Sequence, residues 1–171
     1  MPDHTRVYSS VEERNIATVN SMFEAGPELD RATLFADDAT WWNGLPLLPS
    51  NPGQTEHKGI KAITAILRGS GQPHKGTGID SYDLKTNRFS DVLVLADGDF
   101  VVRQHTQTST TLGGQAYRNV YCFVFHFGAD GKIAYLTEHW NTWYAQRVLF
   151  DNFPVEPAHP LASGDPSGVT G

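Results

Sequence analysis

Residues 115–143 read QAYRNVYCFVFHFGADGKIAYLTEHWNTW, and this stretch decides the fold of the chain. Aromatic and β-branched side chains alternate with other residues over 121–127, which is typical of a β-strand. Residues 128–131, Gly-Ala-Asp-Gly, suit a tight turn because glycine tolerates positive φ angles. A second strand is predicted over about 132–143. The stretch therefore predicts a β-hairpin.

The second arm of this hairpin carries a carboxyl group where a strand core is expected. Glu138 has Leu136 and Trp140 at a spacing of two, so its face of the strand is predicted to be the inner one. A buried carboxyl group is unfavourable unless it is paired or used. Burial beside aromatic rings would raise its pKa and suit it to general acid–base catalysis. The alternative is a glutamate at the rim that pairs with Arg103 or Arg118.

Length and composition are those of one globular domain. The chain has 171 residues, of which 39% are hydrophobic and 11% aromatic, and this is enough for a single substantial core. Its net charge is −6 and its 13 basic residues are scattered, which predicts no nucleic-acid partner and no anionic membrane partner. Cys122 is the only cysteine, so an internal disulfide is excluded. With no apolar run of membrane length and no signal segment at the N-terminus, we expect a cytoplasmic protein.

The rest of the pattern predicts helices first and strands afterwards. Residues 1–10 form a predicted arm in which Ser9 or Ser10 caps the first helix, and the proline-rich residues 151–171 form a predicted tail. The predicted elements are helices over about 11–24, 28–35 and 58–67, a short strand near 40–43, strands over about 79–95, 99–111, 115–127 and 132–143, and a helical turn over 145–150. This order predicts an α+β domain over 11–150, in which three N-terminal helices pack on a curved antiparallel sheet. A proline-rich loop over 44–53 would cover the mouth of a small-molecule pocket.

A second polar set lies in the middle of the predicted strand 99–111. His105 could carry a proton across the pocket to Glu138, because an imidazole titrates near neutral pH. Its position depends on which face of the strand is the inner one. If odd-numbered residues face inward, His105 and Arg103 line the pocket; if even-numbered residues do, Gln104 takes the polar role. A histidine at the surface or at an interface is the alternative.

Aromatic and amide side chains complete the candidate site. Asn119 and Tyr121 share one face of the first hairpin arm, and the Tyr121 phenol could donate a hydrogen bond to a developing oxyanion. Packing in the core is the alternative for this tyrosine. Trp41 could form an aromatic slot with Trp140 for a flat, apolar substrate, or could simply pack in the core.

The seven histidines do not show the spacing of a metal site. No HxH or HExxH pattern occurs, and neither a glycine-rich phosphate loop nor a GxSxG motif is present. We therefore expect no metal and no cofactor.

Several short motifs occur in a characteristic order. They are Phe35-Ala36-Asp37-Asp38 before Trp41-Trp42-Asn43, Gly59-Ile60 at the third helix, and Asp130-Gly131-Lys132-Ile133 before Glu138-His139-Trp140-Asn141-Thr142. Together they resemble the SnoaL-like branch of the NTF2-like superfamily of cone-shaped α+β barrels, over about residues 11–150. The resemblance implies a small homo-oligomer, a homodimer or homotrimer, with cofactor-independent chemistry. Members include ketosteroid isomerase, polyketide cyclases, dehydratases, epoxide hydrolases and carbon–carbon lyases, and others only bind ligands.

The end of the hairpin is similar to limonene epoxide hydrolase. On its motif Glu138 falls on the catalytic acid, and Asn43 falls on an asparagine that helps to hold the attacking water. The hydrolase has an arginine and an aspartate two residues apart, whereas this chain has Arg103 and His105, so the second carboxylate is missing. A carboxylate with a histidine fits proton abstraction, dehydration or a lyase reaction better. The diarylpropane lyases of lignin catabolism have such a task on a two-ring substrate.

We therefore predict a cofactor-independent lyase, dehydratase or isomerase for an apolar, aromatic or polycyclic small molecule. Its predicted catalytic residues are Glu138, His105 and Tyr121. Its predicted substrate-binding residues are Trp41, Asn43, Arg103, Gln104, Asn119 and Trp140. An epoxide hydrolase and a non-catalytic binding module are the alternatives.

Overall fold

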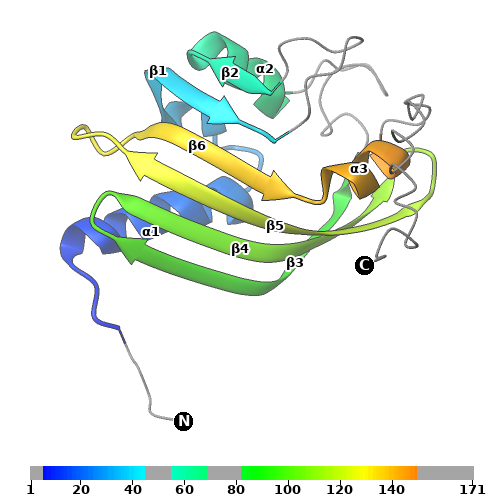
Figure 1. Cartoon of the computed structure of the whole chain (residues 1–171), viewed down its shortest axis with the longest axis horizontal. Helices are drawn as coiled ribbons and strands as arrows, with labels where there is room; N and C mark the ends of the chain where they lie inside the picture. Colours follow the sequence, from blue (N-terminus) through cyan, green and yellow to red (C-terminus); the bar gives the residue numbers. More distant parts are fainter. Residues whose placement is uncertain (1–5, 45–54, 69–81, 150–171) are drawn as a thin grey trace, which may run out of the picture.

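One curved sheet carries most of the fold. The computed structural model describes residues 6–44, 55–68 and 82–149. The helices are α1 (Ser10–Glu24), the 3-10 helix η1 (Arg31–Leu34), α2 (Ile60–Arg68) and α3 (Thr142–Leu149). The strands are β1 (Phe35–Trp42), β2 (Glu56–Lys58), β3 (Tyr82–Asp97), β4 (Phe100–Thr111), β5 (Ala116–Phe127) and β6 (Ile133–Trp140). They form a single sheet in the order β2-β1-β6-β5-β4-β3 (Figure 1).

The strand pairing is antiparallel with one exception. β1 and β6 run parallel, whereas the other four neighbouring pairs are antiparallel. A parallel pair needs a long connection, and the whole chain between β1 and β6 supplies it. The predicted α+β class with helices on a curved, mainly antiparallel sheet is confirmed, and the pair of β1 and β6 is its one parallel pairing. The sheet stays open, with β2 and β3 as its two edges.

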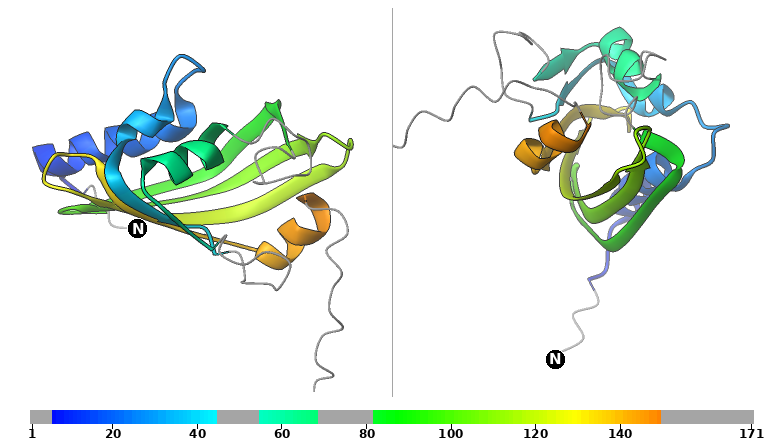
Figure 2. Two further views of the ribbon diagram at one scale, coloured as in Figure 1. Left: turned by 90° about the horizontal axis from the view of Figure 1, so that it is seen from above. Right: turned by 90° about the vertical axis from the view of Figure 1, so that its right-hand side faces the viewer.

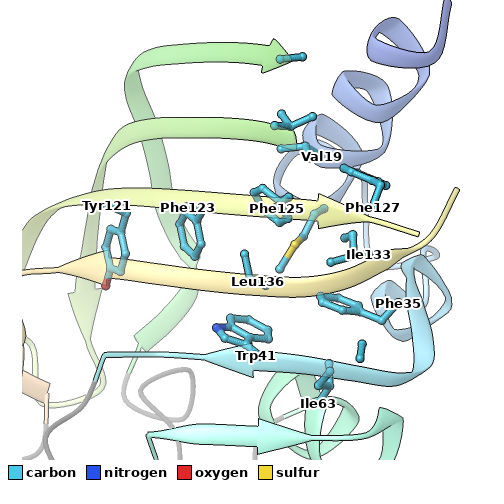
Figure 3. Close-up of a cluster of buried hydrophobic side chains, with 14 of the residues drawn as sticks. Val19, Phe35, Trp41, Ile63, Tyr121, Phe123, Phe125, Phe127, Ile133 and Leu136 are labelled. Carbon is cyan, nitrogen blue, oxygen red and sulfur yellow. The ribbon is translucent and has the colours of Figure 1, made fainter. Parts of the chain in front are cut away.

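The alternation of β5 defines the core. Over 117–127 every odd-numbered residue is buried and no even-numbered residue is. Phe123 and Phe125 lie in a cluster that also contains Val19 of α1 and Ile63 of α2 (Figure 3). The two helices therefore pack against the inner, concave side of the sheet, which is seen from its end in Figure 2.

Helix α1 begins with a capping box. Ser9 Oγ accepts a hydrogen bond from the Glu12 backbone N–H (3.3 Å), and the Glu12 carboxylate accepts one from the Ser9 backbone N–H (2.7 Å). These two bonds satisfy backbone donors that a helix start leaves free. The bond from the Ser9 N–H also lowers the pKa of Glu12. Glu12 further accepts from the Gly98 N–H at 3.2 Å, which ties the helix to the β3–β4 turn. The predicted cap is confirmed.

Several predicted boundaries are wrong. Residues 28–35 contain only the short helix η1, which Asp30 caps through its side chain, and β1 begins directly afterwards. Residue 58, the predicted start of the third helix, instead ends strand β2, and the helix begins at Ile60. The second hairpin arm ends at Trp140, because Asn141 Oδ1 accepts from the Tyr144 N–H (3.0 Å) at the start of α3.

Some predictions lie outside the described residues. These concern residues 1–5 of the arm, residues 45–53 of the proline-rich loop, residues 79–81 of the long strand, and the tail over 151–171. None of the described helices is long and apolar enough to span a membrane.

Candidate active site

Glu138 lies on the inner face of β6, as its spacing predicts. It pairs across the sheet with the buried Phe123 of β5, and cross-strand partners share a face. Its Oε2 accepts a hydrogen bond from Trp41 Nε1 at 3.0 Å. Burial of the carboxyl group raises the pKa of Glu138 to about 8, and the Trp41 hydrogen bond opposes this rise. The residue as a whole is half-buried.

The alternative, an ion pair of Glu138 with Arg103 or Arg118 at the rim, is absent among the described residues. Arg103 pairs instead with Glu24 of α1, and Arg118 points outward from β5. Glu138 is therefore an inward carboxyl group whose described partner is a neutral indole.

Two indoles lie near this carboxyl group. Trp41 is buried and stacks on Phe35, with ring centroids 6.0 Å apart. Trp140 stacks on Tyr121 at 5.4 Å, and its Nε1 donates to the Asn43 backbone carbonyl at 2.6 Å. The sheet therefore brings both tryptophans to the face that carries Glu138, and contact of either with a substrate stays a prediction.

A chain of hydrogen-bonded phenols lies beside Glu138. Tyr121 Oη is 2.8 Å from Tyr117 Oη and 3.1 Å from Tyr82 Oη, and Asn119 Nδ2 donates to Tyr117 Oη at 2.9 Å. Burial raises the pKa of each phenol above its ordinary value, and the charge of Glu138 adds to the rise in all three. The carboxyl group and the phenols are therefore all buried and lie close enough to interact electrostatically.

Sequence reasoning found only part of this chain of phenols. It singled out Tyr121 and Asn119 but missed Tyr117 and Tyr82. The sequence could have indicated Tyr117, because its spacing from Tyr121 places both on the same face of β5. Tyr82 was not, since it lies on β3, which is separated from β5 by β4, and the curvature of the sheet brings the two phenols together.

The structure decides the face of β4. His105 is 1% exposed on the inner face, whereas Gln104 is exposed on the outer face, so the alternative with Gln104 in the pocket is wrong. The His105 ring packs among aromatic rings, including those of Phe23 and Phe89, and neither ring nitrogen has a hydrogen-bond partner. Burial and the charge of Arg103 lower the pKa of His105 to about 4. The expectation that it titrates near neutral pH is therefore wrong.

Arg103 holds α1 on the sheet. It is 1% exposed, and its Nη1 donates to Asn20 Oδ1 at 2.7 Å and to Glu24 Oε1 at 3.0 Å. Its guanidinium also lies over the Phe23 ring, 4.7 Å from the centroid. The predicted contact of Arg103 with substrate is not supported, because these contacts direct the guanidinium to the helix.

The two asparagines of the prediction have partners in the protein. Asn43 Nδ2 lies 3.0 Å from His57 Nε2, so this side chain is directed toward β2. Asn119 Oδ1 accepts from the Asn141 N–H at 3.2 Å and links β5 to the start of α3. Over residues 6–44, 55–68 and 82–149, no three His, Cys, Asp or Glu side chains gather into a metal-binding group.

The sequence pattern of the SnoaL-like domain matches residues 6–136, which is more than half of the chain. This protein belongs to the SnoaL-like domain family. The predicted SnoaL-like branch of the NTF2-like superfamily is therefore confirmed. No curated protein matches the sequence significantly.

Solved structures share this fold. A candidate isomerase from Bacillus subtilis is 17% identical, with 85% of this chain and 99% of that chain covered and a TM-score of 0.63. An NTF2-like protein of unknown function from Burkholderia pseudomallei is 18% identical, with 80% and 97% covered and a TM-score of 0.61. A candidate SnoaL-like polyketide cyclase from Jannaschia sp. is 16% identical, with 86% and 99% covered and a TM-score of 0.63. At these identities the likeness establishes the fold alone.

Proposed function

We propose that this protein is a cofactor-independent enzyme of the lyase, dehydratase or isomerase type. It moves a proton on an apolar, aromatic or polycyclic small molecule, with Glu138 as the acid–base group. The observation that carries the proposal is the inward Glu138 carboxyl group with a pKa of about 8. A general acid or base works best when its pKa lies near the operating pH.

The protonation state of Glu138 suits transfer in both directions. With a pKa of about 8, the carboxyl group is mostly protonated at pH 7, and roughly a tenth of it is ionised. The protonated form can donate to a leaving group or an enolate, and the ionised form can take a proton from carbon. An ordinary exposed glutamate would be almost wholly ionised at this pH and would be a poor acid.

The surroundings of Glu138 favour an aromatic substrate with a polar oxygen. Trp41, Trp140 and Tyr121 are large, flat aromatic side chains on the same face of the sheet as Glu138. The phenols beside the carboxyl group can stabilise negative charge that develops on a substrate oxygen. His105 is neutral at pH 7 because its pKa is about 4, so we assign the proton transfer to Glu138 alone.

The outer face of the sheet supports the predicted homo-oligomer. Even-numbered residues of β4 and β5 point to this side, away from Glu138. Large apolar side chains are exposed there: Leu93, Leu95, Phe100, Val120 and Tyr135. Exposed apolar patches of this kind mark contact surfaces. Sedimentation equilibrium would show a dimer or trimer if the proposal is right and a monomer if it is wrong.

Proton exchange tests the proposed activity. We would incubate the protein with two-ring phenolic and polycyclic carbonyl compounds in D2O, and follow deuterium incorporation and bond cleavage by NMR and mass spectrometry. Glu138→Gln should lower the rate by about 10² to 10⁴-fold and leave the binding of the active compound intact. Glu13→Gln, which changes an exposed carboxyl group on α1, is the matched control and should be fully active.

Two outcomes would contradict the proposal. Full activity of Glu138→Gln would remove this residue from the mechanism. Tight binding of compounds by the wild-type protein, without exchange or cleavage, would favour the non-catalytic binding module. Incorporation of labelled solvent oxygen into a diol would instead identify an epoxide hydrolase.

A further inference from the structure

Trp41 holds one of the two carboxyl oxygens of Glu138. Its Nε1 donates to Glu138 Oε2 at 3.0 Å, and within residues 6–44, 55–68 and 82–149 no other group forms a hydrogen bond with this carboxyl group. An indole N–H donates and cannot accept. The two oxygens of Glu138 therefore differ in their surroundings, because Oε2 lies beside a donor and Oε1 has no partner among the described residues.

The indole of Trp41 has little freedom to turn away from Glu138. Trp41 is 6% exposed, and its ring stacks on Phe35 with an interplanar angle of 8°. It pairs with Leu136 of β6, two residues before Glu138, so the three side chains share the inner face. An indole N–H that turned away would be a buried donor without an acceptor, which is unfavourable. We therefore expect this bond both when Glu138 is protonated and when it is ionised.

Protonation makes the two oxygens of a carboxyl group chemically different. One becomes a carbonyl oxygen, which is the better acceptor, and the other becomes a hydroxyl that donates. If the proton were on Oε2, the Trp41 N–H would have to bond to the weaker acceptor, and the carbonyl oxygen Oε1 would have no donor among the described residues. With the proton on Oε1, the N–H bonds to the carbonyl oxygen. The second arrangement is therefore favoured.

We propose that Trp41 is a positioning residue that keeps the proton of Glu138 on Oε1, so that this one oxygen atom gives and takes the proton in the reaction. During transfer the Oε1–H bond breaks as a bond from the proton to a substrate oxygen or carbon forms. The electron pair stays on the carboxylate, where the Trp41 N–H stabilises it. The inference deepens the proposed function and rests on it, since it names the atom of Glu138 that a substrate must face.

The bond from Trp41 also strengthens when Glu138 loses its proton. A hydrogen bond to an ionised acceptor is roughly twice as strong as one between neutral groups, and the bond accordingly opposes the rise of the Glu138 pKa. The neighbouring titratable groups keep their charge state between pH 5 and pH 9. Burial raises the pKa of the three phenols beside Glu138 above the ordinary value of 10.0, and it lowers the pKa of His105 to about 4. Changes over this pH range therefore report on Glu138.

Infrared difference spectroscopy tests the position of the proton. The band to follow is the C=O stretch of the protonated Glu138 carboxyl group, identified at pH 6 as the band that is lost in Glu138→Gln. A C=O group that accepts a hydrogen bond absorbs at a lower wavenumber than a free one, so Trp41→Phe should move this band to a higher wavenumber. Trp140→Phe is the matched control for the band, which should not move, because Trp140 Nε1 donates to the Asn43 carbonyl instead.

NMR of the wild-type protein gives a second test that needs no variant. The Trp41 Nε1–H resonance, assigned through the contact of its ring with Phe35, should shift with a midpoint near pH 8 as Glu138 ionises. At pH 6 it should still lie at the position of a hydrogen-bonded indole, because the bond to the carbonyl oxygen persists. A proton on Oε2 would instead move this resonance toward the position of an unbonded indole.

The pH dependence of proton exchange separates positioning from a structural role. In Trp41→Phe the midpoint of the pH–rate profile should move upward by roughly one pH unit, because the ionised form of Glu138 loses more than the protonated form. Thermal melting shows whether the variant is folded. A rate that falls by the same factor at every pH would mean that Trp41 only supports the fold.

The outcomes distinguish this inference from the proposed function. An unmoved C=O band in Trp41→Phe, an equal movement of the band in Trp140→Phe, or a Trp41 indole without its hydrogen bond at pH 6 would each overturn the inference, whatever the activity of Glu138→Gln. Full activity of Glu138→Gln together with the expected band movement would instead contradict the proposed function and leave the position of the proton standing.

Discussion

Replacing Glu138 by glutamine should make the fold more stable at high pH. The folded protein holds the Glu138 proton up to a pKa of about 8, whereas the ordinary value is 4.5. The stability that this proton contributes is present in full below pH 4.5, and it is lost as the pH rises through 8. Glutamine has the same shape and no charge to bury, so the variant escapes this loss.

The size of the effect follows from the two pKa values. At about 1.4 kcal/mol per pKa unit, the interval from 4.5 to about 8 corresponds to roughly 5 kcal/mol at pH 9 and roughly 3 kcal/mol at pH 7. Partial exposure of Glu138 makes these values upper bounds. The pKa of His105 is lowered to about 4, so the stability that its neutral form contributes to the fold is lost as the pH falls from 6.5 through 4. Because it does so in both proteins, its contribution cancels in the difference.

Urea denaturation between pH 4 and pH 9, followed by tryptophan fluorescence, measures this difference. We expect equal midpoints at pH 4 and a higher midpoint for Glu138→Gln at pH 9, with an unchanged slope. Glu13→Gln, which changes an exposed carboxyl group and keeps Glu138, is the matched control, and its midpoint should follow that of the wild-type protein. A stability difference that is constant across the pH range, or a wild-type protein that is the more stable one at pH 9, would refute the buried, proton-holding carboxyl group. Stabilisation together with lost activity is the usual pattern at functional sites.

Three further predictions concern the supports of the site. Trp41→Phe removes the hydrogen bond that favours the ionised form of Glu138, so the Glu138 pKa should rise above 8 in a carbon-13 NMR titration; an unchanged or lower value would exclude this bond. Arg103→Met removes the nearby charge, so the His105 pKa should move upward from about 4 by NMR, and the fold should lose roughly 1–3 kcal/mol in urea unfolding. Ser9→Ala removes the cap of α1 and should lower the free energy of unfolding by about 1 kcal/mol, whereas Ser9→Asn should not.

The parts of the fold that local patterns control were predictable. Aromatic residues alternate with other residues over 121–127, and a glycine-containing turn follows. These local features specify a hairpin without reference to the rest of the chain. The same alternation placed Glu138 on the inner face, and a serine three residues before a glutamate marked the start of α1. Asn141 ended the second hairpin arm early because its side chain caps α3, a local signal that the strand pattern obscured.

The assembly of the site depended on contacts that no local pattern contains. The Trp41–Glu138 hydrogen bond joins residues 97 positions apart, and it exists because β1 pairs in parallel with β6. Tyr82 reaches Tyr121 only because the sheet curves over β4. The sequence by itself determined which residues share a face of a strand, because side-chain direction follows from backbone geometry. Only the tertiary structure decided which of them meet and what their pKa values are, because desolvation and hydrogen bonding arise when distant elements close around a group.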